Sequence, residues 1–167
     1  ELKLLLTFEA LVERALRYCD LAVTQGLLAV RSHVDICDDS LLAVDALLAV
    51  KRQVAPYLDL ELVAFPQDGY FRSPTAAANL ARALDKGVSV VGGIPHFERT
   101  MADGPASVKA LCEIAAQRGL RVDMHCDASG DPRPRHSETV AYHTPAPGPL
   151  GRLAAALPHP GELDNTM

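Results

Sequence analysis

Several segments of this chain end in polar side chains that could carry out acid–base chemistry. The clearest is His125-Cys126-Asp127, which follows the largely apolar run 120–124. An imidazole beside a carboxylate is a common arrangement for moving protons. His33 and Asp35 end a second apolar segment, and Gln67 and His96 follow two further ones. The residue types and their spacing therefore indicate a candidate site assembled from several segments of one sheet.

The elements that would position these residues are buried strands, each preceded by a helix. Strands are predicted over residues 27–36, 58–65, 88–94 and 120–125. Gly26, Gly87 and Gly119 stand where the C-terminus of a helix favours a left-handed residue. The units recur at roughly 30 residues, the length of a βα unit with its crossover helix. We therefore expect a parallel α/β fold, with the polar strand ends gathered at the carboxyl edge of the sheet.

Helix starts are marked as clearly as helix ends. Thr7 is expected to cap the first helix, and residues 38–40 supply acidic and capping groups for the second. Ser73-Pro74 is typical of a cap followed by proline at the first helical position, and Gly104-Pro105 is expected to open a further helix.

Composition excludes several classes of function. The chain has 167 residues and a net charge of −5, without the basic footprint that nucleic acid binding requires. The apolar start, residues 1–6, is too short for a membrane span or the core of a signal peptide. Four separated cysteines without CxxC spacing favour a reducing cytoplasm. Because the chain does not begin with Met, we expect its coding sequence to start upstream.

The last part of the chain, residues 131–167, is predicted to be a proline-rich and poorly defined tail. Prolines confine a helix to about 135–142, and 150–157 is at best one more strand. An eight-stranded barrel typically needs about 250 residues. A barrel interpretation therefore implies a fragment.

The blocks 31–35, 63–69, 91–98 and 123–127 together resemble cytosine deaminase and its relatives in the amidohydrolase superfamily. Their order and spacing match across about residues 11–157. The resemblance implies a distorted (β/α)8 barrel, with residues 1–167 forming one partial barrel domain that covers about strands 2 to 6. It also implies one divalent metal, iron or zinc, and the hydrolytic deamination of a pyrimidine or a related small heterocycle.

The same resemblance assigns individual residues. His125 matches the fifth-strand metal ligand, and Gln67 matches the glutamine that contacts the pyrimidine. The family's proton-shuttling glutamate would stand at Ala128, so no catalytic acid is intact. The sixth-strand histidine would fall at Leu157, with His159 two residues further on. The family's His-x-His pair and late aspartate are expected to lie outside this chain, and a single imidazole will not hold a catalytic metal tightly.

The remaining polar residues are interpreted as supporting groups. His33 and Asp35 are expected at the barrel mouth, where they orient neighbouring ligands or have a structural role. His96 and Glu98 would line a pocket or cap their strand, and Asp127 would orient a neighbour or accept backbone hydrogen bonds. The sequence also places His136 and His143 on a solvated helix, and it shows no base pattern that would make Cys37 or Cys126 a reactive thiol.

Three functional alternatives remain open from the sequence. The chain is part of a metal-dependent deaminase, or it is a catalytically inactive relative that acts as a binding module. A complete flavodoxin-like domain is disfavoured, because no glycine-rich loop follows the first strand. Open sheet edges predict self-association of the isolated chain.

Overall fold

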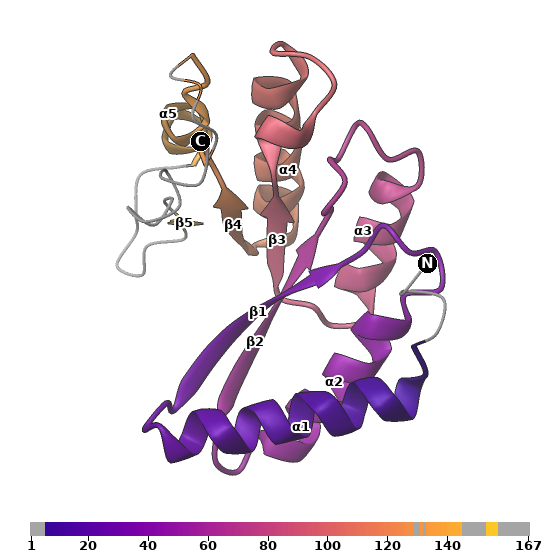
Figure 1. The fold of residues 1–167 in the computed structure, drawn as a ribbon. Coiled ribbons are helices and arrows are strands. Elements are labelled where there is room, and N and C mark those ends of the chain that lie inside the picture. The colour runs from indigo at the N-terminus through magenta and orange to yellow at the C-terminus, as the bar shows by residue number, and fades with distance from the viewer. Residues whose placement is uncertain (1–5, 129–130, 132, 145–152, 157–167) are drawn as a thin grey trace, which may run out of the picture.

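The computed structural model describes residues 6–128, 131, 133–144 and 153–156, and these form one parallel sheet with helices between its strands (Figure 1). The strands lie in the order β1-β2-β3-β4-β5, and every neighbouring pair is parallel. Their bounds are β1 Ala29–Asp35, β2 Asp59–Phe65, β3 Val90–Gly93, β4 Arg121–His125 and β5 Leu153–Ala156. The helices are α1 Phe8–Thr24, α2 Leu42–Val54, α3 Ala76–Asp85, α4 Asp103–Arg118 and α5 His136–His143.

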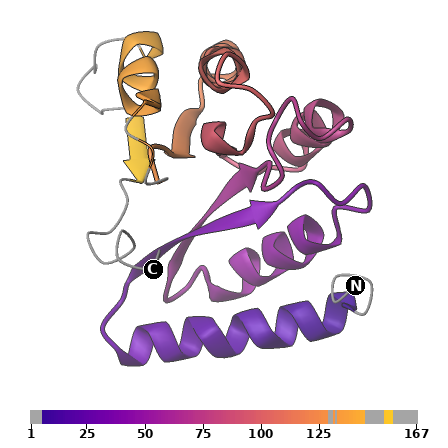
Figure 2. The ribbon, with the colours of Figure 1, turned by 45° about the horizontal axis from the view of Figure 1, so that its top comes forward.

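Each strand is added beside the preceding one, which is how a (β/α)8 barrel is built. Figure 2 shows the helices in an arc around the strands. The predicted parallel α/β fold with partial barrel architecture is therefore confirmed. The expected fifth strand is present as β5, whereas residues 145–152 and 157–167 of the tail lie outside the described residues.

Most of the predicted helix boundaries agree with the structure. The Thr7 Oγ1 atom accepts a hydrogen bond from the Ala10 N–H at 3.2 Å. Gly26 and Gly119 adopt φ angles of +85° and +65° after α1 and α4. α4 begins at Asp103, one residue before the predicted Gly104-Pro105 start.

The prediction for Ser73-Pro74 is wrong, because α3 begins only at Ala76. Ser73 instead closes the turn that precedes the helix. Its N–H donates to the Gly69 carbonyl, and its own carbonyl accepts from the Ala76 N–H, each at 3.3 Å. This turn lengthens the loop between β2 and α3.

The two faces of the sheet bury different residues. The helix-facing side chains of the strands join the main core, which includes Leu60, Leu62 and Met124. On the opposite face, Val63, Phe65, Val90 and Ile94 form a separate apolar cluster. Side chains alternate along a strand, so residues of the same parity as Phe65 point to this second face. We call it the inner face, because the helices surround the other one.

Candidate functional site

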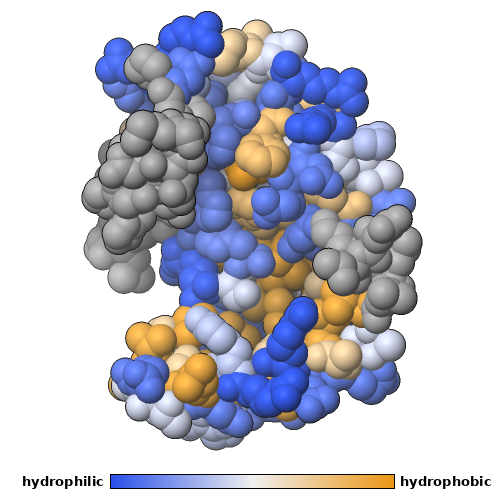
Figure 3. All heavy atoms as spheres, viewed as in Figure 1, coloured by the Kyte–Doolittle hydropathy of each residue, from blue (hydrophilic) through white to orange (hydrophobic). Residues whose placement is uncertain are grey.

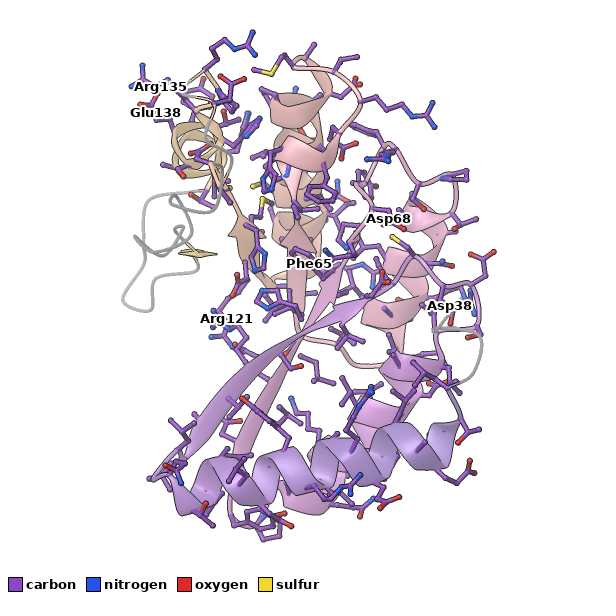
Figure 4. The ribbon with its side chains drawn as sticks, in the orientation of Figure 1. Asp38, Phe65, Asp68, Arg121, Arg135 and Glu138 are labelled. Atoms are coloured by element: carbon purple, nitrogen blue, oxygen red, sulfur yellow. The ribbon has the colours of Figure 1, made fainter. Side chains whose placement is uncertain are left out.

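Three aromatic side chains meet on the inner face near the carboxyl ends of the strands. The His33 and His125 ring centroids lie 4.6 Å apart, and Phe65 lies 5.0 Å from His33 and 4.7 Å from His125. Figure 4 labels Phe65 at the centre of this region. We call His33, Phe65 and His125 the ring cluster.

The ring cluster requires a strongly curved sheet. His33 is on β1 and His125 is on β4, with β2 and β3 between them. In a flat sheet, three strand spacings would separate these residues by about 14 Å. Gly92 of β3 leaves room for the Phe65 ring, because a Cβ there would lie 2.7 Å from Phe65 Cδ2. The curvature of a barrel wall is therefore what brings the two imidazoles together.

A buried carboxylate supports the ring cluster from below. The Asp123 side chain is 5% exposed. Its Oδ1 lies 3.2 Å from His33 Nε2, and its Oδ2 accepts from Arg31 Nη1 at 2.7 Å. Burial would raise the pKa of Asp123, but the hydrogen bonds from His33 and Arg31 outweigh it, and this pKa lies below its ordinary value. Asp123 is therefore a carboxylate that holds the His33 imidazole in place.

The ion pairs continue along the inner face. Arg31 Nε donates to Glu61 Oε2 at 2.6 Å, and Glu61 Oε1 pairs with Arg121. Arg121, labelled in Figure 4, comes from the first residue of β4. Two arginines thus alternate with two acids across β1, β2 and β4. Their charges balance, as pairing in a half-buried site requires.

Sequence reasoning missed this network, although a signal was present. Asp123 is a single acid inside a buried strand, two residues before His125, and Arg31 stands two residues before His33. Because strand side chains alternate, each pair shares one face. A charge in the middle of an apolar strand was the clue that a partner of opposite charge lies on a neighbouring strand.

The described residues do not provide a complete metal site. His125 is half-buried at the end of β4, but no group of three or more His, Cys, Asp or Glu side chains within the described ranges is arranged to hold a metal ion. Catalytic zinc usually has about three protein ligands. Ala128 is exposed and supplies no proton-transferring group three residues after His125. The alternative histidine, His159, lies outside the described residues.

Asp127 follows two residues after His125 and organises the start of α5. It adopts φ +56°, and its two carboxylate oxygens accept from the His136 and Ser137 N–H groups at 2.8 and 2.9 Å. Burial raises the pKa of Asp127, but these hydrogen bonds more than compensate, so the pKa is lowered. The carboxylate is therefore engaged by the backbone.

His136 is buried, with 3% of its surface exposed, so the prediction that it lies on a solvated surface is wrong. The physical reason is a glycine on the neighbouring helix. A Cβ on Gly104 would lie only 2.3 Å from His136 Nε2, so the absence of a side chain there makes room for the imidazole. Burial lowers the pKa of His136, and it also lowers that of the half-buried His96, assisted by the nearby His136. Both rings are therefore biased towards the neutral form.

Asp35 and Gln67 belong to loops at the carboxyl edge of the sheet. Asp35 Oδ1 accepts the Cys37 N–H at 2.9 Å. Gln67 is exposed, and its N–H donates to the Phe65 carbonyl at 2.9 Å. Gln67 therefore stands two residues after Phe65 of the ring cluster.

Two cysteines lie close to this edge, but neither is activated. Burial raises the pKa of the Cys126 thiol to about 12, and burial also raises that of Cys37. Both side chains are therefore thiols rather than nucleophilic thiolates near neutral pH.

A separate apolar cavity of about 390 Å³ lies between α1, α2 and the outer side of β1. Its lining is mostly apolar and includes Leu11, Val30 and Leu47. Figure 3 shows apolar residues in the hollowed centre of one face of the molecule, flanked by hydrophilic ones. The cavity adjoins β1, which among the described residues pairs with β2 alone, and its lining includes His33 but not Phe65 or His125.

No family model matches the chain. In structure, it is similar to 5-methylcytosine deaminase from Klebsiella pneumoniae liganded with 5-fluorocytosine, with a TM-score of 0.87 and 40% identity over 92% of the chain. It is also similar to N-isopropylammelide isopropylaminohydrolase from Burkholderia multivorans, with a TM-score of 0.66 and 27% identity over 77% of the chain. In sequence, it is 27% identical over 154 residues to N-isopropylammelide isopropyl amidohydrolase of Pseudomonas sp. strain ADP. The chain covers 37%, 33% and 37% of these proteins, respectively.

Proposed function

Because this chain is a cytosine deaminase-like relative of the amidohydrolases in sequence and fold, we propose that it forms the substrate-facing part of a hydrolase that deaminates a pyrimidine or related heterocycle. The observation that carries the proposal is the ring cluster at the carboxyl edge of the sheet. Aromatic walls suit a flat heterocycle, and this edge is where barrel enzymes bind their substrates.

Within this proposal, Gln67 recognises the ring and His125 is one ligand of a divalent metal, iron or zinc. A glutamine side chain both donates and accepts hydrogen bonds, which matches the amide-like edge of a pyrimidine. His33, Asp35, His96 and Asp127 support the site by holding its neighbours. The metal would need ligands beyond those that the described residues offer, so no chemical step is assigned to it.

A second candidate is a binding module that holds the heterocycle without turnover. Ala128 favours it, because alanine cannot transfer a proton at the position where the family's glutamate is expected. In both cases the ligand is a small heterocycle. A cytoplasmic location stays a prediction; within the described part of the chain, no helix has the length and apolarity to cross a membrane.

Gln67→Ala should weaken the binding of 5-fluorocytosine about 10-fold, because it removes hydrogen bonds worth roughly 1–3 kcal/mol to the ring. The measurement is a ¹⁹F NMR titration of the full chain. Gln53→Ala is the matched control, since Gln53 is exposed near the end of α2 and should leave the affinity unchanged. Equal affinities of the Gln67 and Gln53 variants would remove Gln67 from the site. Lack of binding to the unmodified chain would overturn the proposal itself.

Elemental analysis with an ammonia-release assay on cytosine separates the two candidates. Stoichiometric iron or zinc together with turnover supports the deaminase. Binding without ammonia release supports the binding module. In a complete barrel that holds its metal, Ala128→Glu should raise ammonia release by about 10²-fold, because a carboxylate at position 128 would supply the missing proton transfer. An unchanged rate in that barrel would show that position 128 is not that of the family's glutamate.

We also propose that the isolated chain self-associates through β1. Among the described residues, β1 pairs with β2 alone, so one side of its backbone has no partner strand. Exposed Leu28 directly precedes this strand, and Val30 and Ser32 of β1 line the apolar cavity. Unpaired edges readily recruit further strands.

Light scattering after size-exclusion chromatography should therefore give a mass above the 17.9 kDa of one chain. Ser32→Lys on β1 should reduce that mass, because a charge on an edge strand opposes its pairing with a strand of another chain. A single 17.9 kDa species that unfolds cooperatively would contradict the proposed self-association.

A further inference from the structure

The loop between β2 and α3 carries Gln67 and is held by residues from other parts of the chain. Its first turn is local: the Gly69 N–H donates to the Pro66 carbonyl at 2.9 Å. Further hydrogen bonds to this loop come from residues after β1 and after β3. Gln67 and its neighbour Asp68 are exposed, so packing alone does not fix them.

Glu98 binds this loop through its backbone. Its Oε1 accepts the Tyr70 N–H at 2.7 Å, and its Oε2 accepts the Phe71 and Arg72 N–H groups at 3.1 and 3.0 Å. Glu98 follows β3 and the 3₁₀ turn Pro95–Phe97. One carboxylate thus satisfies three successive amides, and hydrogen bonds to a charged acceptor are the stronger kind.

Gly69 permits this close approach. Its φ is +93°, and a Cβ at this position would lie 3.1 Å from Glu98 Oε2 and 3.0 Å from Arg72 Cβ. A side chain here would press on the carboxylate and on the turn that the carboxylate binds. The backbone conformation and the contact with Glu98 therefore depend on the same glycine.

A second tether binds Asp68, the residue directly after Gln67. The Asp68 N–H donates to Cys37 Sγ at 3.4 Å, and the Cys37 N–H is itself held by Asp35. Figure 4 labels Asp68 in this loop. The segment after β1 and the segment after β3 thus hold the loop from both sides, and the Glu98 contacts are the more numerous and the shorter.

We propose that Glu98 is a positioning residue for Gln67: by binding the Tyr70, Phe71 and Arg72 amides, it fixes the loop that presents Gln67 to the heterocycle. This inference rests on the proposed function. It also assigns the Glu98 carboxylate to the backbone, which leaves it occupied as an acceptor and does not make it a catalytic residue.

Hydrogen exchange of the full chain tests the tether without any ligand. Glu98→Ala should speed exchange of the Tyr70, Phe71 and Arg72 amides by about 10-fold or more, because Phe71 and Arg72 are otherwise exposed to solvent. Glu98→Gln keeps one acceptor oxygen and should give an intermediate rate. Exchange in β2 should not change in either variant. Unchanged rates for the three amides in Glu98→Ala would overturn the proposal.

Binding of 5-fluorocytosine tests whether the tether acts through Gln67. Glu98→Ala should weaken binding about 5-fold, with Glu98→Gln in between, and the double variant with Gln67→Ala should bind no more weakly than Gln67→Ala alone. Glu113→Ala is the control, since Glu113 is exposed on α4 and should leave the affinity unchanged. Additive losses in the double variant would overturn the positioning role. If the unmodified chain does not bind 5-fluorocytosine, the proposed function fails, while the exchange rates still decide whether Glu98 holds the loop.

Discussion

Asp123→Ala should lower the free energy of unfolding by about 3 kcal/mol, the range expected when one partner of a buried ion pair is removed. The Asp123 carboxylate is 5% exposed and bonds both Arg31 and His33. Its loss leaves the Arg31 side chain, which is 30% exposed, without one of its two acids. We place the effect at the lower end of the range, because Glu61 still pairs with Arg31. Urea unfolding followed by circular dichroism measures it.

Two further variants make this result specific. Asp59→Ala removes an exposed acid at the start of β2 and should change stability by no more than about 0.5 kcal/mol. The double variant Arg31→Met with Asp123→Ala should lose less free energy of unfolding than the sum of the two single losses, by about 1 kcal/mol or more. The reason is that Arg31→Met removes the charge that Asp123→Ala leaves unpaired. Strict additivity would mean that the two side chains do not stabilise each other in solution.

Gly92→Ala should lower the free energy of unfolding by about 2 kcal/mol or more, because the added methyl group overpacks the inner face. The new Cβ would lie 2.8 Å from the Ala64 carbonyl oxygen and 2.7 Å from Phe65 Cδ2. A backbone oxygen inside a sheet cannot move aside, so β3 must shift relative to β2. The shift would also displace Phe65 from the ring cluster, and 5-fluorocytosine binding should weaken.

The neighbouring glycine provides a matched control for this overpacking. A Cβ at Gly93 would also lie 2.8 Å from its nearest atom, but that atom is Leu111 Cδ1, the far end of a flexible side chain. Gly93→Ala should therefore reduce stability by less than Gly92→Ala, about 1 kcal/mol. The reverse order would show that the inner face is looser than the structure indicates.

The local signals in the sequence predicted the elements well. Thr7 and Gly26 delimit α1 because a cap and a left-handed residue act within one turn of the chain. The helix start predicted at Ser73-Pro74 was wrong, because the Ser73 N–H donates to the Gly69 carbonyl in the turn that precedes α3. Capping preferences describe isolated helix ends, whereas here the preceding loop fixes where the helix starts.

The site was harder to predict, because its contacts depend on curvature and on distant partners. No local sequence pattern around His33 predicts that its ring will contact His125 across two intervening strands. The burial of His136 depends on a missing side chain at Gly104 of another helix. The resemblance pointed to Gln67 and His125, and the sequence marked Glu98 as a pocket or capping residue, but the backbone amides that Glu98 binds and the partners of Asp123 became visible only in the structure.

The hydrogen bond between Arg31 and Asp123 also bears on the kinetics of folding, since it joins residues 92 positions apart in the sequence. Each βα unit can form from contacts within itself and with the next unit, but this bond requires that the first and fourth strands already stand in place. Contacts of such long range form late on the folding route. An interaction that is absent from the transition state acts mainly on the rate of unfolding. We therefore expect the inner-face ion pair to slow the unfolding of the curved sheet more than it speeds its folding.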